Sequence, residues 1–244
     1  MTYSIKPLIL NKVRESKGLM TYLVGYEERI WLPHVVWYIN GSEKNILVDT
    51  GIPFPIYERK YSYGRPCEEV QTFEQALSSV NLSPEDIDLV IQTHLHFDHC
   101  GNTYKCNRAK VIVQEEELKF AYSPHAVFVG SYNLEFLKGL RFEIVSGEVE
   151  ILPGIKVIHL PGHTPGTQAV SIETRKGRAV ISGFCCIGEN LFPPEKLRTK
   201  WPVIAPGVSV NPLQAFDSAL KLKGLGEILI PQHDIEFAQR PEIP

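Results

Sequence analysis

The stretch THLHFDH at residues 93–99 places three imidazoles and a carboxylate within seven residues, directly after an apolar run. Neutral imidazole and carboxylate are ligands for zinc and similar ions. If the chain stays extended, His94 and His96 point to one face, Asp98 follows on that side, and His99 faces the other way. Crowding these groups together without a metal would be costly. We therefore predict a metal site here.

Further ligands must come from elsewhere, because this short stretch cannot supply a complete coordination cage. The motif LPGHTPG places His163 in a tight loop after an apolar run, and LIPQHD places His233 at the end of another. Functional groups on β scaffolds often lie where a strand gives way to a loop. His34, His125 and His159 stand alone in their segments, and we interpret them as ordinary hydrogen-bonding residues.

Composition narrows the class of protein. The chain has 244 residues, of which 43% are hydrophobic and 22% charged, as in soluble globular proteins, and we predict a single domain over residues 1–244. A net charge of -3 without a basic block argues against a nucleic-acid partner. No apolar run approaches the roughly 20 residues of a membrane helix. Five irregularly spaced cysteines and the lack of a signal-peptide pattern favour a cytoplasmic location.

The order of apolar and turn segments predicts an α+β fold. Residues 35–51 read as a hairpin, residues 109–122 as a strand followed by a helix, and residues 142–181 as a run of strands. A helix over residues 211–226 comes before the last strand. We expect two largely antiparallel sheets packed face to face with helices outside. The aromatic residues of segment 115–141 suit either a wall of a substrate pocket or the core.

A family resemblance joins these motifs. THLHFDHCG resembles the HxHxDH signature of the metallo-β-lactamase superfamily, and LVDTG, LPGHTPG and LIPQHD occur in that family's order. The resemblance spans roughly residues 34–234. It implies an αββα sandwich with a metal centre at one sheet edge. It also implies two zinc ions as the cofactor, with iron or manganese as alternatives.

The family resemblance implies a role for individual residues of this chain. It assigns His94, His96 and His163 to one metal, and Asp98, His99 and His233 to the other. Asp49 in LVDTG resembles the family's aspartate that orients the ligands without binding metal itself. The alternative for Asp49 is a plain turn residue before Gly51.

The stretch ISGFCC at residues 181–186 departs from the family pattern. Dinuclear members carry a bridging aspartate there, and this chain has no carboxylate. Aligning the glycines puts Phe184 at that position, whereas counting from His163 puts Cys185 there. A thiolate binds zinc and phenylalanine cannot, so we predict that Cys185 replaces the aspartate. A metal pair joined only by a water-derived ligand, a single occupied site, and Cys185 and Cys186 as buried apolar residues remain as alternatives.

Within the superfamily, the hairpin before ILVDTG and the segment HTPGTQAVSIET look most like the N-acyl homoserine lactonase group. This likeness implies a metal-dependent hydrolase that opens a lactone or other carboxylic ester by metal-activated hydroxide, with Asp98 as the catalytic carboxylate. The family tyrosine after the bridging position is missing from IGEN. A thioesterase of the glyoxalase II kind and a metal-binding or redox-sensing protein without hydrolase activity are the alternatives. We expect a small-molecule substrate and no membrane partner, and we leave a homodimer open.

Overall fold

Two long strands pair near one edge of the first sheet. In the computed structural model, which describes residues 2–244, β1 (Ser4–Ser16) pairs antiparallel with β2 (Arg29–Asn40). The strand order is β4-β1-β2-β3-β5-β6-β7. The other members are β3 (Ile46–Val48), β4 (Cys67–Glu69), β5 (Leu89–Ile91), β6 (Lys110–Gln114) and β7 (Arg141–Val145).

The second sheet has five strands in the order β12-β11-β10-β9-β8. They are β8 (Val149–Leu152), β9 (Ile155–His159), β10 (Gln168–Thr174), β11 (Gly177–Ile181) and β12 (Ile228–Ile230). The hairpin predicted over residues 35–51 is present, because β2 pairs antiparallel with β3, and within the predicted run of strands β10 pairs antiparallel with β11.

The sheets are mixed, and the expectation of largely antiparallel pairing is wrong for half of the first sheet. Strands β3, β5, β6 and β7 run parallel, and so do β11 and β12. The cause lies in the connections. Helices separate these strands along the chain, and a crossover through a helix brings the next strand back in the same direction. The hairpin signals in the sequence do not reveal such crossovers.

The inner faces of the two sheets share one hydrophobic core. Trp37 and Ile39 of β2 face Ile172 of β10 across this core, while the intervening Val36 points to the opposite side of its sheet. In the second sheet, Ile181 points inward and Val180 points outward. This alternation is the period of two expected of strands. Because both sheets contribute to one core, the packing supports the single-domain proposal.

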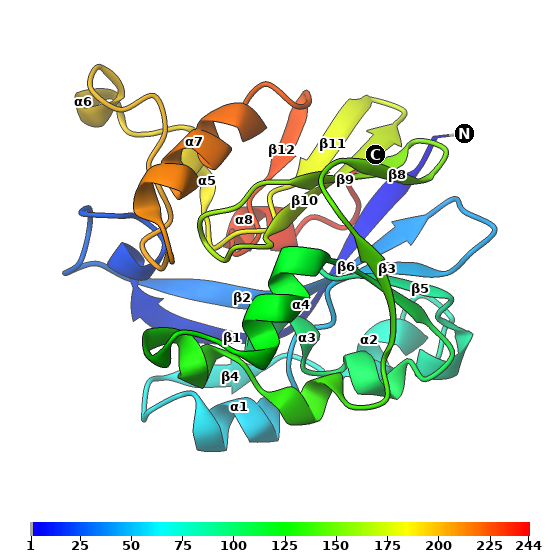
Figure 1. The fold of residues 1–244 in the computed structure, drawn as a ribbon. Helices are drawn as coiled ribbons and strands as arrows, with labels where there is room; N and C mark the ends of the chain where they lie inside the picture. The colour runs from blue at the N-terminus through cyan, green and yellow to red at the C-terminus, as the bar shows by residue number, and fades with distance from the viewer. Residues whose placement is uncertain (1) are drawn as a thin grey trace.

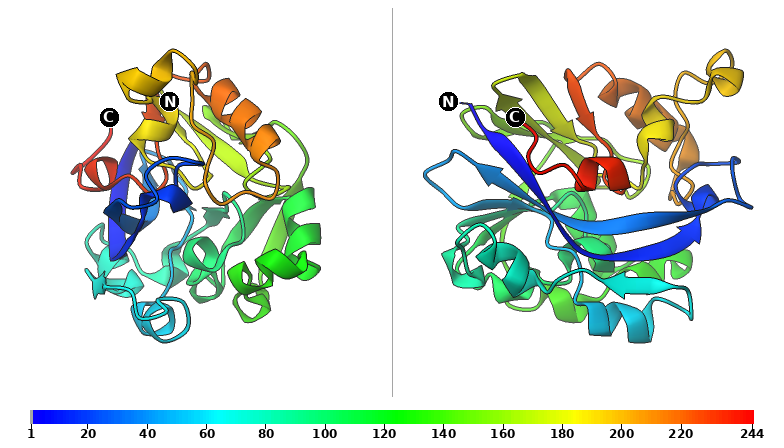
Figure 2. Two further views of the ribbon diagram at one scale, coloured as in Figure 1. Left: turned by 90° about the vertical axis from the view of Figure 1, so that its left-hand side faces the viewer. Right: turned by 180° about the vertical axis from the view of Figure 1, so that it is seen from behind.

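Helices cover both outer faces, which gives the expected αββα arrangement (Figures 1 and 2). Apolar residues of α2 pack on the first sheet, and those of α7 pack on the second. The helices are α1 (Phe54–Lys60), α2 (Phe73–Ser78), α3 (Phe97–Cys100), α4 (Glu115–Tyr122), α5 (Gly188–Leu191), α6 (Glu195–Arg198), α7 (Pro212–Leu222) and α8 (Ile235–Ala238). Within residues 2–244, none of these helices has the length and apolar character that crossing a membrane requires.

The sandwich brings the histidine-bearing loops to one edge. The parallel strands β3 and β5 end side by side, so Asp49 and the loop after Ile91 are neighbours. The loop after β12 crosses to the same place, where the backbone N–H of His233 donates to the Cys186 carbonyl oxygen, 3.0 Å away. The predicted motifs therefore meet because the ends of several strands meet.

Substitution of Trp37 tests the hydrophobic core between the two sheets. It is fully buried among inward-facing residues of both sheets. Trp37→Ala should lower the free energy of unfolding by about 3–5 kcal/mol, because it removes a large apolar group and leaves a cavity. Denaturant unfolding measures the change. Leu213→Ala is the control, since that side chain is 79% exposed and its loss should change stability by less than about 0.5 kcal/mol. Equal effects of the two substitutions would contradict the assigned core.

Candidate metal centre

The HxHxDH stretch is extended only in its first part. Strand β5 ends at Ile91, and His96 keeps extended dihedral angles as the residue before α3. The rings of His94 and His96 lie close together, with centroids 4.6 Å apart. Asp98 and His99 lie within the helical turn that follows. The condition that the chain stays extended therefore holds only as far as His96, and the turn separates the motif into two pairs of ligands.

The fold gathers the predicted ligands into two groups of three. One ligand atom from each residue lies within 4.8 Å of the others in the group of His94, His96 and His163, and likewise in the group of Asp98, His99 and His233. These groups are the ones that the family resemblance predicts. In the first group, the Nε2 atoms of His94 and His163 are 3.2 Å apart. That separation suits two ligands of one ion.

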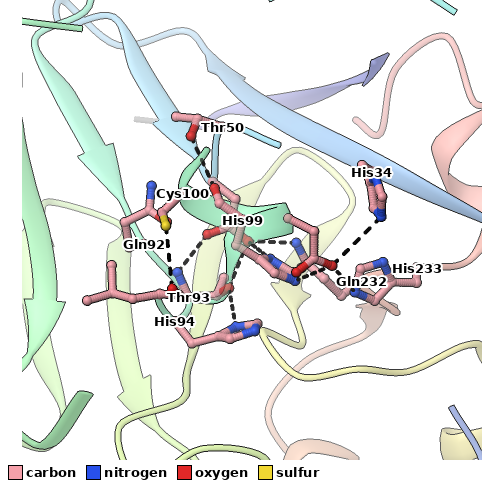
Figure 3. Close-up of polar contacts among 12 residues, drawn as sticks. His34, Thr50, Gln92, Thr93, His94, His99, Cys100, Gln232 and His233 are labelled. Atoms are coloured by element: carbon pink, nitrogen blue, oxygen red, sulfur yellow. Dashed lines mark hydrogen bonds and ion pairs between the residues drawn. The ribbon is translucent and has the colours of Figure 1, made fainter. Parts of the chain in front are cut away.

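Asp49 holds the ligand loops in place. Its buried carboxylate accepts hydrogen bonds from the backbone N–H and the hydroxyl of Thr93, each at 2.7 Å. It also accepts from His99 Nδ1 at 2.7 Å and from Gln232 Nε2 at 2.8 Å (Figure 3). The φ of Asp49 is 57°, a conformation in which aspartate is tolerated better than most residues. This carboxylate connects the loops after β3, β5 and β12.

The ligand imidazoles are oriented through their outer nitrogens. His99 Nδ1 donates to Asp49, His163 Nδ1 to the Val208 carbonyl at 2.6 Å, and His233 Nδ1 to the Pro33 carbonyl at 3.1 Å. Each Nε2 therefore carries a lone pair. Buried Nε2 atoms of His96, His99 and His233 have no hydrogen-bond partner among the described residues. A cation between these nitrogens would satisfy them, so the residues present fit a bound metal.

Burial sets the charge of these groups. It lowers the pKa of His94 and His96 well below the usual value, and it lowers that of His163 to about 4. Burial would raise the pKa of Asp98, but the neighbouring imidazoles, with His99 foremost, hold it below its usual value. His99 differs because the Asp98 and Asp49 carboxylates overcome its burial and raise its pKa. His94, His96 and His163 therefore favour the neutral form that binds metal, whereas the raised pKa of His99 means that metal binding there displaces a proton.

Glu117 is a positioning residue that the sequence did not single out. It looks like one of three acidic residues that begin α4, yet its side chain is fully buried. Its carboxylate accepts from the backbone N–H of Leu95 at 2.9 Å, from the Tyr132 hydroxyl at 3.1 Å, and from Thr164 beside His163. It thus joins the two loops that carry the first ligand group. No spacing in the sequence distinguishes it from its exposed neighbours.

A cavity opens beside the two ligand groups. His96, Asp98 and His233 line it together with the charged residues Glu15 and Arg65, and its apolar lining residues include Val13, Leu19, Met20, Leu32 and Val208. None of the aromatic residues of segment 115–141 lines this cavity, so of the two alternatives the structure favours the core. Ser131 of this segment lines the cavity, while Tyr132 and Phe136 are buried in a hydrophobic cluster.

The cavity also contains residues that sequence reasoning missed. His34 and Tyr57 line it, with ring centroids 4.8 Å apart. The interpretation of His34 as an ordinary isolated histidine therefore overlooked its place beside the metal ligands. No local motif marks it, because β2 reaches the centre only after the sheets have packed.

The two residues of ISGFCC that could stand at the position of the missing carboxylate lie in different surroundings. Phe184 is buried in the cluster beneath α7, away from the ligands. Cys185 lines the cavity, but neither ligand group includes its Sγ. Cys186 is buried, with its Sγ 3.0 Å from Ser182 Oγ. Burial and then Asp98 raise the pKa of Cys185, so its thiol stays protonated unless a cation binds next to it.

Comparison with known proteins agrees with this geometry. The sequence model of the Metallo-beta-lactamase superfamily matches residues 29–227. The chain belongs to this superfamily. An N-acyl homoserine lactonase of Bacillus sp is 32% identical over 227 residues, which are 86% of this chain and 82% of that protein. An N-acyl homoserine lactonase of Bacillus cereus is 31% identical, over 84% of this chain and 80% of that protein.

Solved structures support the fold of this superfamily member. The structure of Bacillus thuringiensis AiiA with N-decanoyl-L-homoserine bound has a TM-score of 0.78 and 24% identity, covering 97% of this chain and 95% of that one. AidC, a dizinc quorum-quenching lactonase, has a TM-score of 0.70 and 15% identity, covering 98% and 89%. At these identities the likeness establishes the sandwich architecture alone.

Asp49→Asn should weaken metal binding without unfolding the protein. An amide nitrogen would face the N–H groups that Asp49 now accepts, and His99 would lose its charged partner. Losing such a partner typically lowers metal affinity 10- to 100-fold. Zinc titration of the chelator-treated protein measures the effect. Asp217→Asn, an exposed change on α7, should leave the affinity unchanged. Unchanged affinity in Asp49→Asn would show that this carboxylate does not orient the ligands.

The metal-free protein should lose stability as the pH falls from 6.5 to 4. His34 and His163 have an ordinary pKa of 6.5, which burial lowers to about 4 in the folded state. In this window the unfolded chain binds protons that the folded chain does not, so acid favours unfolding. Thermal unfolding measured across the window should show a smaller decline in His163→Gln than in wild type. Parallel curves would contradict the assignment.

Proposed function

We propose that this superfamily member is a metal-dependent hydrolase that opens N-acyl homoserine lactones. One observation carries the proposal: both groups of ligand residues contribute to the lining of a cavity that apolar side chains also line. The ligand residues suit a lactone ring, and the apolar lining residues suit an acyl chain. The lactonase names of the two Bacillus relatives support this choice of substrate.

The proposed ligands are His94, His96 and His163 for one ion and Asp98, His99 and His233 for the other. Zinc is the proposed metal, since neutral imidazole and carboxylate are common zinc ligands. When bound, such ions acidify water and polarise a carbonyl group. Cys185 as a further ligand remains a prediction from the sequence, and so do the cytoplasmic location and the lack of a nucleic-acid partner.

The chain's own residues supply binding, orientation and proton transfer. Asp98 belongs to the second ligand group and also lines the cavity, where its carboxylate can take the proton that water loses on attacking the lactone carbonyl. The same carboxylate returns that proton to the alkoxide oxygen when the ring C–O bond breaks. The products are a hydroxyl and a carboxylic acid, which loses its proton to solvent to become a carboxylate, and Asp98 is regenerated. Tyr57 is the tyrosine that lines the cavity, whereas IGEN contributes none of its lining residues.

The alternatives are less favoured. The thioesterase alternative shares the same centre, but the relatives named above are lactonases rather than thioesterases. The sensor alternative leaves the cavity without a role.

N-Hexanoyl- and N-decanoyl-homoserine lactone should be opened by the metal-loaded protein. His96→Ala should reduce the rate more than about 100-fold, since even partners of ligands contribute 10- to 100-fold. Chromatography of the ring-opened product gives the rate, with chelator-treated protein as the metal-free reference. Exposed His125→Ala is the matched control and should retain activity. Faster turnover of thioesters would favour the thioesterase, and a lack of metal-dependent turnover on either class would favour the sensor.

A further inference from the structure

His34 occupies a position in β2 from which its side chain enters the metal centre. It is 4% exposed, and its ring packs edge-on against Tyr57, at an interplanar angle of 66°. It lines the same cavity as Asp98 and His233. Figure 3 shows its ring directed toward the cluster of labelled site residues, with a dashed contact that corresponds to its approach to Asp98.

Hydrogen bonds determine which ring nitrogen of His34 carries the hydrogen and which carries the lone pair. Asn11 Nδ2 donates to the Ile52 carbonyl at 2.9 Å, which orients the amide so that Oδ1 is available as an acceptor. His34 Nδ1 bonds that Oδ1 and therefore carries the ring hydrogen. The Nε2 atom is left with a lone pair and has no hydrogen bond with any described residue.

This arrangement is the one found for the ligand histidines. His99, His163 and His233 also commit Nδ1 to an acceptor and turn Nε2 toward the centre. The two histidines away from the centre differ. His159 Nε2 bonds the Pro165 carbonyl, and His125 Nδ1 accepts from the backbone of Val127. His34 therefore has the outer-partner pattern of a metal ligand.

The distances place His34 around the same carboxylate oxygen as the ligands. Asp98 Oδ2 is 3.5 Å from His99 Nε2, 3.8 Å from His34 Nε2 and 4.0 Å from His233 Nε2. Ligand atoms that share an ion at 2.0–2.2 Å lie roughly 3 to 4.2 Å apart. His34 Nε2 and Asp98 Oδ2 cannot hydrogen-bond each other when both are acceptors. A cation near both atoms removes the repulsion between their lone pairs.

On the basis of the metal-dependent function above, we propose that His34 Nε2 is an additional ligand of the metal held by Asp98, His99 and His233. The chain lacks the bridging aspartate, and neither Cys185 Sγ nor His34 Nε2 belongs to the two compact ligand groups, but His34 Nε2 lies 3.8 Å from Asp98 Oδ2. An imidazole from β2 then fills a coordination position that the missing carboxylate leaves open. The second site becomes one carboxylate and three imidazoles.

Zinc titration by calorimetry tests the proposal on the full-length, chelator-treated protein. Wild type should bind two equivalents. His34→Phe keeps a ring but removes the lone pair, so it should retain the first equivalent and bind the second at least about 100-fold more weakly. His34→Asp restores a ligand oxygen and should recover part of that affinity. His125→Phe, at an exposed histidine, should bind both equivalents as wild type does.

Two results of the titrations would overturn the proposal. One is an unchanged second equivalent in folded His34→Phe, and the other is loss of that equivalent in Cys185→Ala alone, which would assign the position to the thiolate. A zinc-bound crystal structure of wild type decides the matter if the variants fail to fold, with Nε2 expected about 2.0–2.1 Å from zinc. A filled second site with Nε2 beyond about 3 Å would also overturn it. Because these readouts are of binding, they stand apart from the lactonase assay.

Discussion

The buried carboxylate of Asp49 is the constraint on which the centre depends. It accepts four hydrogen bonds, and their donors come from Thr93, His99 and Gln232. Thr93 and His99 follow β5 of the first sheet, whereas Gln232 follows β12 of the second. A single group therefore fixes the relative positions of loops from both halves of the sandwich. Without it, two ligand loops would lose their common anchor.

Several buried histidine nitrogens in the metal centre carry lone pairs that accept no hydrogen bond from the described residues. Buried Nε2 atoms of His96, His99 and His233 lack partners, and His94 and His163 approach with Nε2 atoms 3.2 Å apart. Such an arrangement is costly unless a cation binds, because neither solvent nor hydrogen bonds compensate the buried polar atoms. Glu117 and Asp49 hold the loops against this repulsion. Hydrogen bonds to Asp49 and Glu117, which need not bind metal themselves, thus keep the ligand residues in the arrangement of a metal site.

Much of the fold and of the site could be predicted from sequence motifs. The HxHxDH stretch and the two single-histidine loops carry their own signal, since ligand residues of a recognisable type occur directly after apolar strands. The sandwich and its covering helices were predicted from the order of apolar and turn segments along the chain. The parallel strands could not be predicted from hairpin signals, because their pairing depends on helical crossovers. The turn at Asp98 was missed because four residues of α3 are too few for a helical period.

The remaining site residues depend on tertiary packing. Glu117 is indistinguishable in sequence from the two exposed glutamates before it, and only burial gives it a role. His34 lies 60 residues before His94 and reaches the centre because β2 is the long inner strand of its sheet. Gln232 donates a hydrogen bond to Asp49, a contact that no motif in the sequence predicts.

Anomalous diffraction from zinc-grown crystals of the wild-type protein tests the central claim most directly. We predict one peak among His94, His96 and His163 and a second beside Asp98, His99 and His233, each about 2.0–2.2 Å from its ligand atoms. Crystals that show no anomalous peak at either group, with the imidazoles turned away from one another, would contradict the account.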